Sequence, residues 1–197
     1  MRSISLVLAA LLMTNCTTIQ CEAFDLDKGI VDYFFFPEFE PSYAFVSDRN
    51  DTMIYDRLVY ETTEAYENKC HMCSCTQKLD VSYEQRDGSN QLSNYAIYDS
   101  HLFPDSEGST NYDINGLIAT VYVEADTLTE SQYSDISQEK IFELKKGVEL
   151  DLGDTIYTDL IELSLIEKQD NAINILWIKE SVGLIAYSHS QTIWKLN

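Results

Sequence analysis

Basic residues are scarce in this chain. Its 197 residues include 13 Lys and Arg against 33 Asp and Glu, which gives a formal net charge of −20. A protein that binds nucleic acid through its phosphates needs a basic face, so the composition excludes that function class. Docking on an anionic membrane through a polybasic patch is disfavoured for the same reason.

Glycine, proline and histidine are also scarce. Seven Gly and three Pro exclude collagen-like and low-complexity chains. No two glycines form the Gly-x-Gly of a phosphate-binding loop, and the Gly-x-Ser-x-Gly turn of a hydrolase nucleophile is missing. With three histidines and no recognisable triad, we assign no catalytic residue and expect that the protein is not an enzyme.

Apolar and aromatic residues, in contrast, are plentiful. Hydrophobic residues make up 45% of the chain, and there are 13 Tyr and 8 Phe. That is enough apolar material to build a core, so the acidity does not indicate disorder. The carboxylates are expected on the solvent-facing sides of the secondary structure.

The first residues have the pattern of an export signal. Arg2 precedes an apolar run at 4–13, which has the length of a signal-peptide core and is too short to cross a bilayer. We therefore predict a signal peptide at 1–15, a tether at 16–30 and a single β-rich domain at 31–197.

Two cleavage positions remain open. The apolar run ends almost directly at Cys16, as in a bacterial lipoprotein whose lipid is attached to that cysteine. In the alternative, a signal peptidase cuts after the small-x-small site that ends at Ala23. Cleavage before Cys16 leaves 12 Lys and Arg against 33 Asp and Glu, a net charge of −21. The chain is expected to be exported, and either anchored in the outer membrane or free in the periplasm or outside the cell.

The periodicity of the apolar residues is mostly two, which indicates strands. Helix is plausible only at 134–144, and the same stretch could contain a strand at 141–144. Short polar connections predict a mainly β, single antiparallel meander with little helix, as a curved sheet, a sandwich or an open barrel. Besides 141–144, the expected strands are 42–46, 52–55, 58–62, 79–83, 94–98, 116–124, 148–152, 160–165, 173–178, 182–187 and 191–196.

Two aromatic and glycine motifs flank this strand pattern. An aromatic-Pro block, Tyr33 to Pro37, opens the domain, and Val182-Gly183-Leu184-Ile185 precedes a last strand with Trp194. With the leader, these motifs resemble small secreted lipoproteins of Bacteroidota-type bacteria that have no assigned function. The resemblance implies a fold and an address rather than a chemistry.

The five cysteines carry the most distinctive chemistry of the chain. Four of them, Cys21, Cys70, Cys73 and Cys75, would remain after lipidation of Cys16, an even number that allows two disulfides in an oxidising compartment. Alternatively, a soft ion such as Zn²⁺ or Cu(I) could be held by thiolate and imidazole ligands. The metal ligands would then be Cys70, His71, Cys73 and Cys75.

Three functions from different classes remain. The first is an exported, lipid-anchored acidic β domain of the bacterial cell envelope with a non-enzymatic binding or structural role. The second is a lipoprotein that binds Zn or Cu through the 70–75 cluster, and the third is an unrecognised envelope hydrolase. The expected partners are the membrane, through the lipid, and an unknown protein or envelope ligand.

Overall fold

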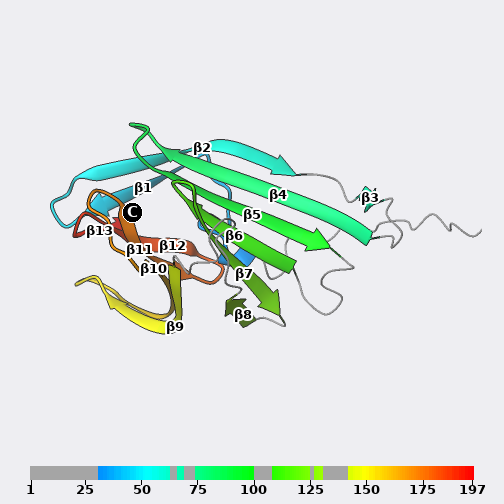
Figure 1. The fold of residues 1–197 in the computed structure, drawn as a ribbon. Helices are drawn as coiled ribbons and strands as arrows, with labels where there is room; N and C mark the ends of the chain where they lie inside the picture. The colour runs from blue at the N-terminus through cyan, green and yellow to red at the C-terminus, as the bar shows by residue number, and fades with distance from the viewer. Residues whose placement is uncertain (1–30, 63–65, 69–73, 100–107, 125–126, 131–141) are drawn as a thin grey trace, which may run out of the picture.

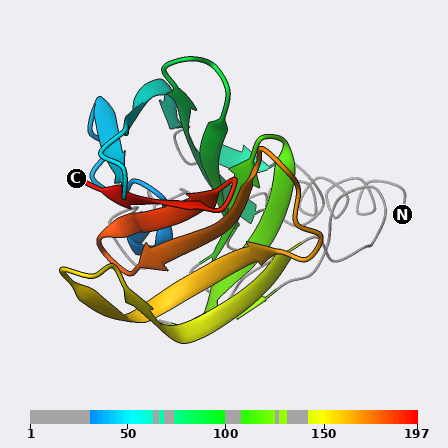
Figure 2. The same ribbon diagram turned by 90° about the vertical axis from the view of Figure 1, so that its left-hand side faces the viewer.

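A computed structural model describes residues 31–62, 66–68, 74–99, 108–124, 127–130 and 142–197 of the chain. These residues form one antiparallel sheet that curls strongly about its long axis (Figures 1 and 2). The prediction of a mainly β fold built from an antiparallel, curved sheet is confirmed. One short 3₁₀ turn, η1 at Val31–Tyr33, precedes the strands.

The sheet has thirteen strands. Their bounds are β1 Ser42–Ser47, β2 Thr52–Thr62, β3 Tyr66–Asn68, β4 Ser74–Gln85, β5 Gln91–Asp99, β6 Gly108–Ile114, β7 Leu117–Glu124, β8 Thr127–Glu130, β9 Phe142–Asp151, β10 Ile156–Leu165, β11 Ile173–Lys179, β12 Gly183–His189 and β13 Thr192–Leu196.

The first half of the chain runs from β1, in the middle of the sheet, outward to the edge strand β8. The second half starts at the opposite edge with β9 and returns to the middle with β13. The spatial order is β8-β7-β6-β5-β4-β2-β1-β13-β12-β11-β10-β9, with β3 paired to the end of β4. Two meanders are therefore joined where the first strand meets the last, with Phe45 opposite Leu196 and Ser47 opposite Trp194. Strands β8 and β9 form the two edges.

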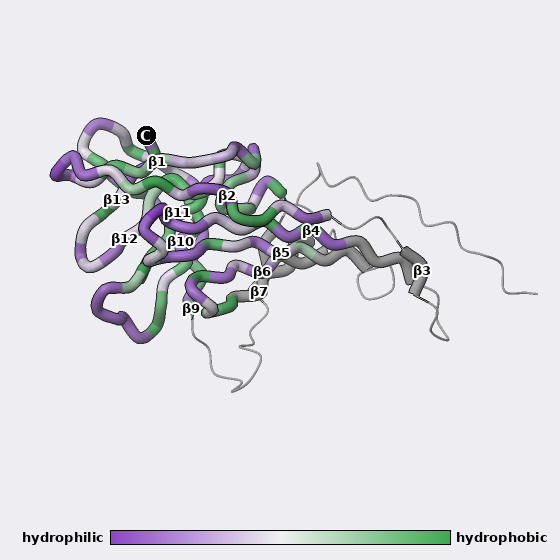
Figure 3. Tube along the Cα trace, turned by 90° about the horizontal axis from the view of Figure 1, so that it is seen from above, coloured by the Kyte–Doolittle hydropathy of each residue, from purple (hydrophilic) through white to green (hydrophobic). Residues whose placement is uncertain are grey.

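Side chains alternate between the two faces of the strands, as a half-buried sheet requires. In β4, Leu79, Val81 and Tyr83 point to the concave face and are buried, whereas Asp80 and Glu84 lie on the outer face. Figure 3 shows hydrophobic and hydrophilic stretches interleaved along the strands. The acidic residues thus take the solvent-facing positions that the composition predicted.

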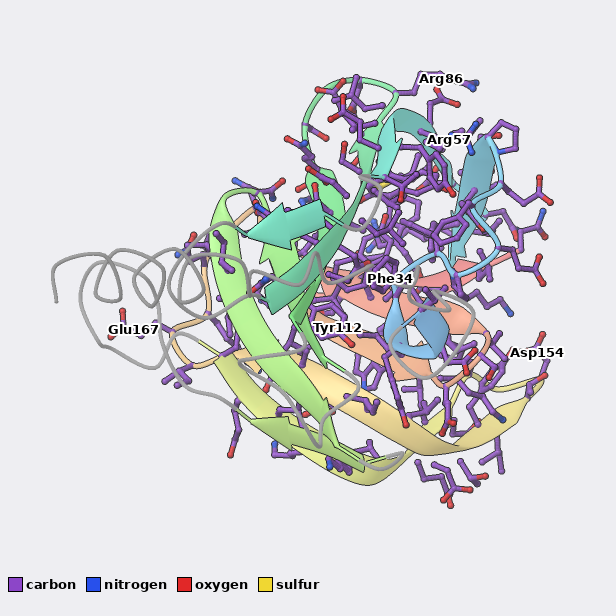
Figure 4. The ribbon with its side chains drawn as sticks, turned by 90° about the vertical axis from the view of Figure 1, so that its right-hand side faces the viewer. Phe34, Arg57, Arg86, Tyr112, Asp154 and Glu167 are labelled. Carbon is purple, nitrogen blue, oxygen red and sulfur yellow. The ribbon has the colours of Figure 1, made fainter. Side chains whose placement is uncertain are left out.

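The concave face is filled by the aromatic segment that precedes the sheet, residues 33–36. All four of its side chains are at most 5% exposed. The Phe36 ring lies 4.3 Å from the rings of Tyr43 and Tyr83, and the Phe35 ring lies 5.0 Å from Tyr112. Figure 4 shows Phe34 and Tyr112 inside the curl of the sheet. The main core therefore consists of this segment and the inner faces of both meanders.

Hydrogen bonds fix the aromatic segment to both halves of the sheet. On one side, Asn94 accepts a hydrogen bond from the Phe35 amide at 2.7 Å, and the Tyr112 hydroxyl donates to the Tyr33 carbonyl at 2.7 Å. On the other side, the Leu184 amide donates to the Phe35 carbonyl at 2.8 Å. Because buried backbone groups need such partners, the segment has little freedom to leave the core.

Gly183 makes room for this segment. Its φ is +90°, and a Cβ placed on it would collide with the Phe35 carbonyl oxygen and lie 2.6 Å from Cδ of Pro37. A side chain at this position would therefore push the aromatic segment away from β12. The Val-Gly-Leu-Ile motif therefore needs a glycine at 183 because the aromatic-Pro block leaves no room for a side chain there.

The end of the β9–β10 hairpin folds back over the outer face of the sheet. Each strand has one irregular step, and Gly147 and Asp159 adopt positive φ values of 66° and 58° at these steps. Bulges of this kind bend a hairpin. Asp154, at the turn, then reaches Lys195 on β13, three strands away, with an oxygen–nitrogen distance of 3.0 Å.

This folded hairpin end covers a second hydrophobic cluster. Leu160, Trp177, Ile185 and Ala186 are each at most 6% exposed, and Leu150 joins them at 9%. Strands β11 and β12 are consequently buried on both faces. Their sequences are nearly continuous apolar runs for that reason, whereas half-exposed strands alternate.

Several boundaries differ from the sequence predictions. The stretches 52–55 and 58–62 are one strand, β2, and β9 runs through both 142–144 and 148–151. A bulge interrupts the alternation in β2 and an irregular step does so in β9, so each strand was divided in two. Strands β3, β6 and β8 were missed because Ser, Thr, Asn and Glu dominate them. For the stretch 134–144, the strand alternative is confirmed at 142–144, and the remainder lies outside the described residues.

Candidate functional site

The outer face of the sheet is where a ligand could meet the described part of the chain. A curled sheet often holds ligands on its concave side, but here that side is packed with residues 33–36. A site must therefore be built from outward-facing side chains, the hairpin end and the open strand edges.

A shallow hollow of about 470 Å³ lies on the outer face over β9, β10 and β11. It adjoins the connection that leaves β10. Its lining combines two lysines, two glutamates, a serine and three apolar residues, namely Glu143, Lys145, Glu162, Ser164, Leu165, Ile166, Lys168 and Ile175. The hollow is thus close to electrically neutral in a strongly acidic protein.

Glu162 organises the floor of this hollow. It lies directly between Lys145 on β9 and Trp177 on β11 in the strand register. Its carboxylate accepts a hydrogen bond from the Trp177 indole nitrogen at 3.0 Å and one from the Lys145 ammonium at 3.3 Å. The Glu162 side chain is only 16% exposed, so both bonds act in a partly desolvated place.

Lys145 is shared by two carboxylates. Glu143 lies 3.4 Å from its ammonium nitrogen, in addition to Glu162. The hydrogen bonds to Glu162 and then Glu143 raise the pKa of Lys145, so this lysine remains a cation and cannot serve as a base. Its charge is already balanced by the protein itself.

The serine that lines the hollow is not hydrogen-bonded to a base. The Ser164 hydroxyl donates to the Glu143 backbone carbonyl at 3.5 Å, so a backbone group and not a base is its partner. Ile166 is 51% exposed at the rim. Lys168, also exposed, forms no ion pair with any residue that the structure describes.

A second outer-face feature lies on the other half of the sheet. Glu61 on β2 stands directly opposite Asp80 on β4, and Asp113 on β6 acts on the same carboxyl. Burial first, and then the charges of Glu61 and Asp113, raise the pKa of Asp80 above its usual value. Opposed like charges on neighbouring strands destabilise a sheet, so this group favours a cationic neighbour.

Most of the site residues predicted from the sequence lie outside the described residues. These are Cys16, Cys21, Cys70, His71 and Cys73. Cys75 is described through its backbone, which lies on β4 opposite Glu67 of β3. Lipidation, disulfide pairing and metal binding at these positions remain predictions.

Within the described ranges, no three His, Cys, Asp or Glu side chains lie close enough together to hold one metal ion, and this includes Glu61, Asp80 and Asp113. The same ranges contain no helix of the length and apolarity that a membrane crossing would need. Comparisons of the chain with protein-family models, curated proteins and solved structures find no match.

Sequence reasoning missed the Glu162 cluster and the acidic group. The alternation of 160–165 placed Glu162 on a solvent face, but it did not identify the facing residue on β11. Trp177 faces Glu162 through the regular register between β10 and β11, which neither strand specifies by itself. The position of Lys145 opposite Glu162 depends in addition on two irregular steps in the β9–β10 pair. The one available signal was Trp177 itself, because a tryptophan in a buried strand needs an acceptor for its N–H.

Proposed function

We propose that this protein is an exported, lipid-anchored acidic β domain of the bacterial cell envelope, with a non-enzymatic role in binding or supporting a partner. The apolar run at 4–13 that ends near Cys16 supports the export and the anchor. The 15 residues at 16–30 would then form a tether, which could hold the domain up to roughly 50 Å from the membrane.

The observation that carries the binding role is the filled concave face. Tyr33, Phe34, Phe35 and Phe36 occupy the place where a curled sheet would enclose a substrate. Reaction chemistry needs a water-excluding pocket with a positioned nucleophile and base. The described outer face instead offers a shallow hollow and open edges, which suit contact with a large partner.

This proposal can be tested by measuring whether the protein becomes lipidated at Cys16. We expect labelled palmitate to enter the full chain in a bacterial host that processes lipoproteins, and we expect Cys16→Ser to abolish the labelling. Cys21→Ser is the matched control, because it removes a thiol five positions later in the same stretch and should label normally. An unlabelled wild-type chain, cleaved after Ala23, would overturn the anchor.

A further inference from the structure

One edge of β2 is open over its second half. Strand β1 covers β2 only as far as the pair Ser42–Asp56, whereas β4 continues along the other side to Thr62. Among the described residues, no strand pairs with the free side of 58–62. Strand β3 prolongs this edge, since it also pairs with β4 (Figure 1). An open edge presents unpaired backbone groups that an added strand can use.

Exposed apolar and aromatic side chains accompany this edge. Leu58 is 57% exposed and Tyr60 is 48% exposed. The Tyr60 ring lies 5.3 Å from the Phe39 ring and 5.7 Å from the guanidinium carbon of Arg57. Tyrosine and arginine are the residue types that carry most binding energy in protein interfaces. The edge therefore has side-chain contacts to offer as well as backbone groups.

The charge beside the edge indicates which partner fits. Glu61 and Asp80 face each other on the outer face, Asp113 is near, and none of the three has an ion pair among the described residues. A second copy of this chain would bring another Glu61 and a further net charge of −20. A basic segment would instead relieve the repulsion between the paired carboxylates.

We propose that the open edge of β2 at Leu58–Thr62 accepts an extended basic segment of a partner protein as an added strand. Alternate side chains of a strand point to opposite faces. Apolar side chains of the segment would contact Tyr60 and Phe39, and its basic side chains would face Glu61 and Asp80. This inference rests on the proposed binding role and specifies the class of partner.

The probe is a short synthetic peptide of alternating Lys and Val, and the control peptide alternates Glu and Val. We expect calorimetry to show binding of the Lys peptide alone, weakened by added salt. Hydrogen exchange should show new protection at amides within 58–62. Tyr60→Ala should weaken binding about 10-fold, because it removes an aromatic interface residue.

Charge-matched variants separate this site from the overall acidity. Glu61→Gln should weaken binding about 3-fold, since one exposed charge pair is lost. Glu149→Gln makes the same charge change at another exposed edge-strand position, on β9, and should leave the affinity unchanged. Both side chains are exposed, so neither variant should unfold the domain. The unfolding midpoint should stay unchanged in Glu149→Gln and should not fall in Glu61→Gln, which relieves the repulsion with Asp80.

Four results would overturn the inference. They are no binding of the Lys peptide, equal binding of the Glu peptide, protection that lies elsewhere in the sheet, and a dimer of this chain that protects 58–62. None of them depends on the lipid, which palmitate labelling reports separately. The proposal of a binding edge on β2 could therefore be refuted while the proposal of a lipid-anchored protein is retained. Equally, the lipid anchor could be refuted while the Lys peptide still binds at 58–62.

Discussion

The contact between Gly183 and the aromatic segment leads to a quantitative prediction for Gly183→Ala. Two costs add in this variant. A residue with a Cβ in the left-handed region loses about 1–2 kcal/mol. The Cβ would also collide with the Phe35 carbonyl oxygen and Cδ of Pro37, and overpacking of this kind costs about 1–3 kcal/mol. We therefore expect a loss of about 2–5 kcal/mol in the free energy of unfolding.

Gly116→Ala is the matched control for this variant. Gly116 lies in the β6–β7 turn with a φ of +85°, close to the +90° of Gly183, and a Cβ there would meet no atom within 4 Å. Only the backbone cost of about 1–2 kcal/mol should therefore appear. The difference between the two variants isolates the collision, at about 1–3 kcal/mol.

Urea unfolding followed by tryptophan fluorescence measures both losses, and the slope of the free energy against urea should stay constant. Adding Pro37→Ala to Gly183→Ala removes one colliding atom and should recover part of the loss, although Pro37→Ala alone should not stabilise the protein. If Gly183→Ala costs no more than Gly116→Ala, the glycine is not there to admit the aromatic segment, and the reasoning fails.

Three further predictions concern the core and the outer face. Tyr112→Phe should cost about 1–2 kcal/mol in urea unfolding, because the buried Tyr33 carbonyl loses a hydrogen bond of 2.7 Å. Asp154→Asn should leave the urea midpoint nearly unchanged, since its ion pair is exposed, whereas Trp177→Ala should cost about 3–5 kcal/mol. A larger loss for Asp154→Asn than for Trp177→Ala would show that the ion pair holds the hairpin end in place. Stability should fall steeply above pH 10, because unfolded tyrosines ionise there while folded ones retain their protons. The folded tyrosines retain their protons because burial raises the pKa of Tyr55 to about 12 and also raises the pKa of Tyr83, Tyr112 and Tyr187. Unfolding curves at pH 9, 10 and 11 measure the expected loss of stability.

Strands in which apolar and polar residues alternate could be predicted from the sequence, because one face of each is buried and the other is exposed to solvent. For 79–83 and 160–165, the apolar positions mark the concave face directly. The runs at 173–178 and 182–187 were also predicted as strands, joined by a short polar connection. Their double burial is a tertiary effect, since a distant hairpin end covers the outer face, and no local pattern reports it.

The order of the strands was predictable only in part. Short polar turns predict that consecutive strands pair, and this holds within each meander. The pairing of β1 with β13 joins residues from opposite ends of the domain, and no local signal specifies it. The Glu162 cluster and the acidic group at Glu61 depend on cross-strand register, which bulges shift by one residue at a time.

The aromatic-Pro block at the start of the domain and the Val-Gly-Leu-Ile motif near its end contact each other. The aromatic segment at 33–36 packs against Gly183 at the start of β12, and the first strand pairs with the last. Neither half of the sheet can cover residues 33–36 alone, because Asn94 and Tyr112 hold one side and Leu184 holds the other. Contacts between residues so distant in sequence must form late, so the domain should fold slowly and as a unit. A chain that ends before β11 would leave the aromatic segment exposed, which makes the C-terminal hairpin necessary for solubility as well as for stability.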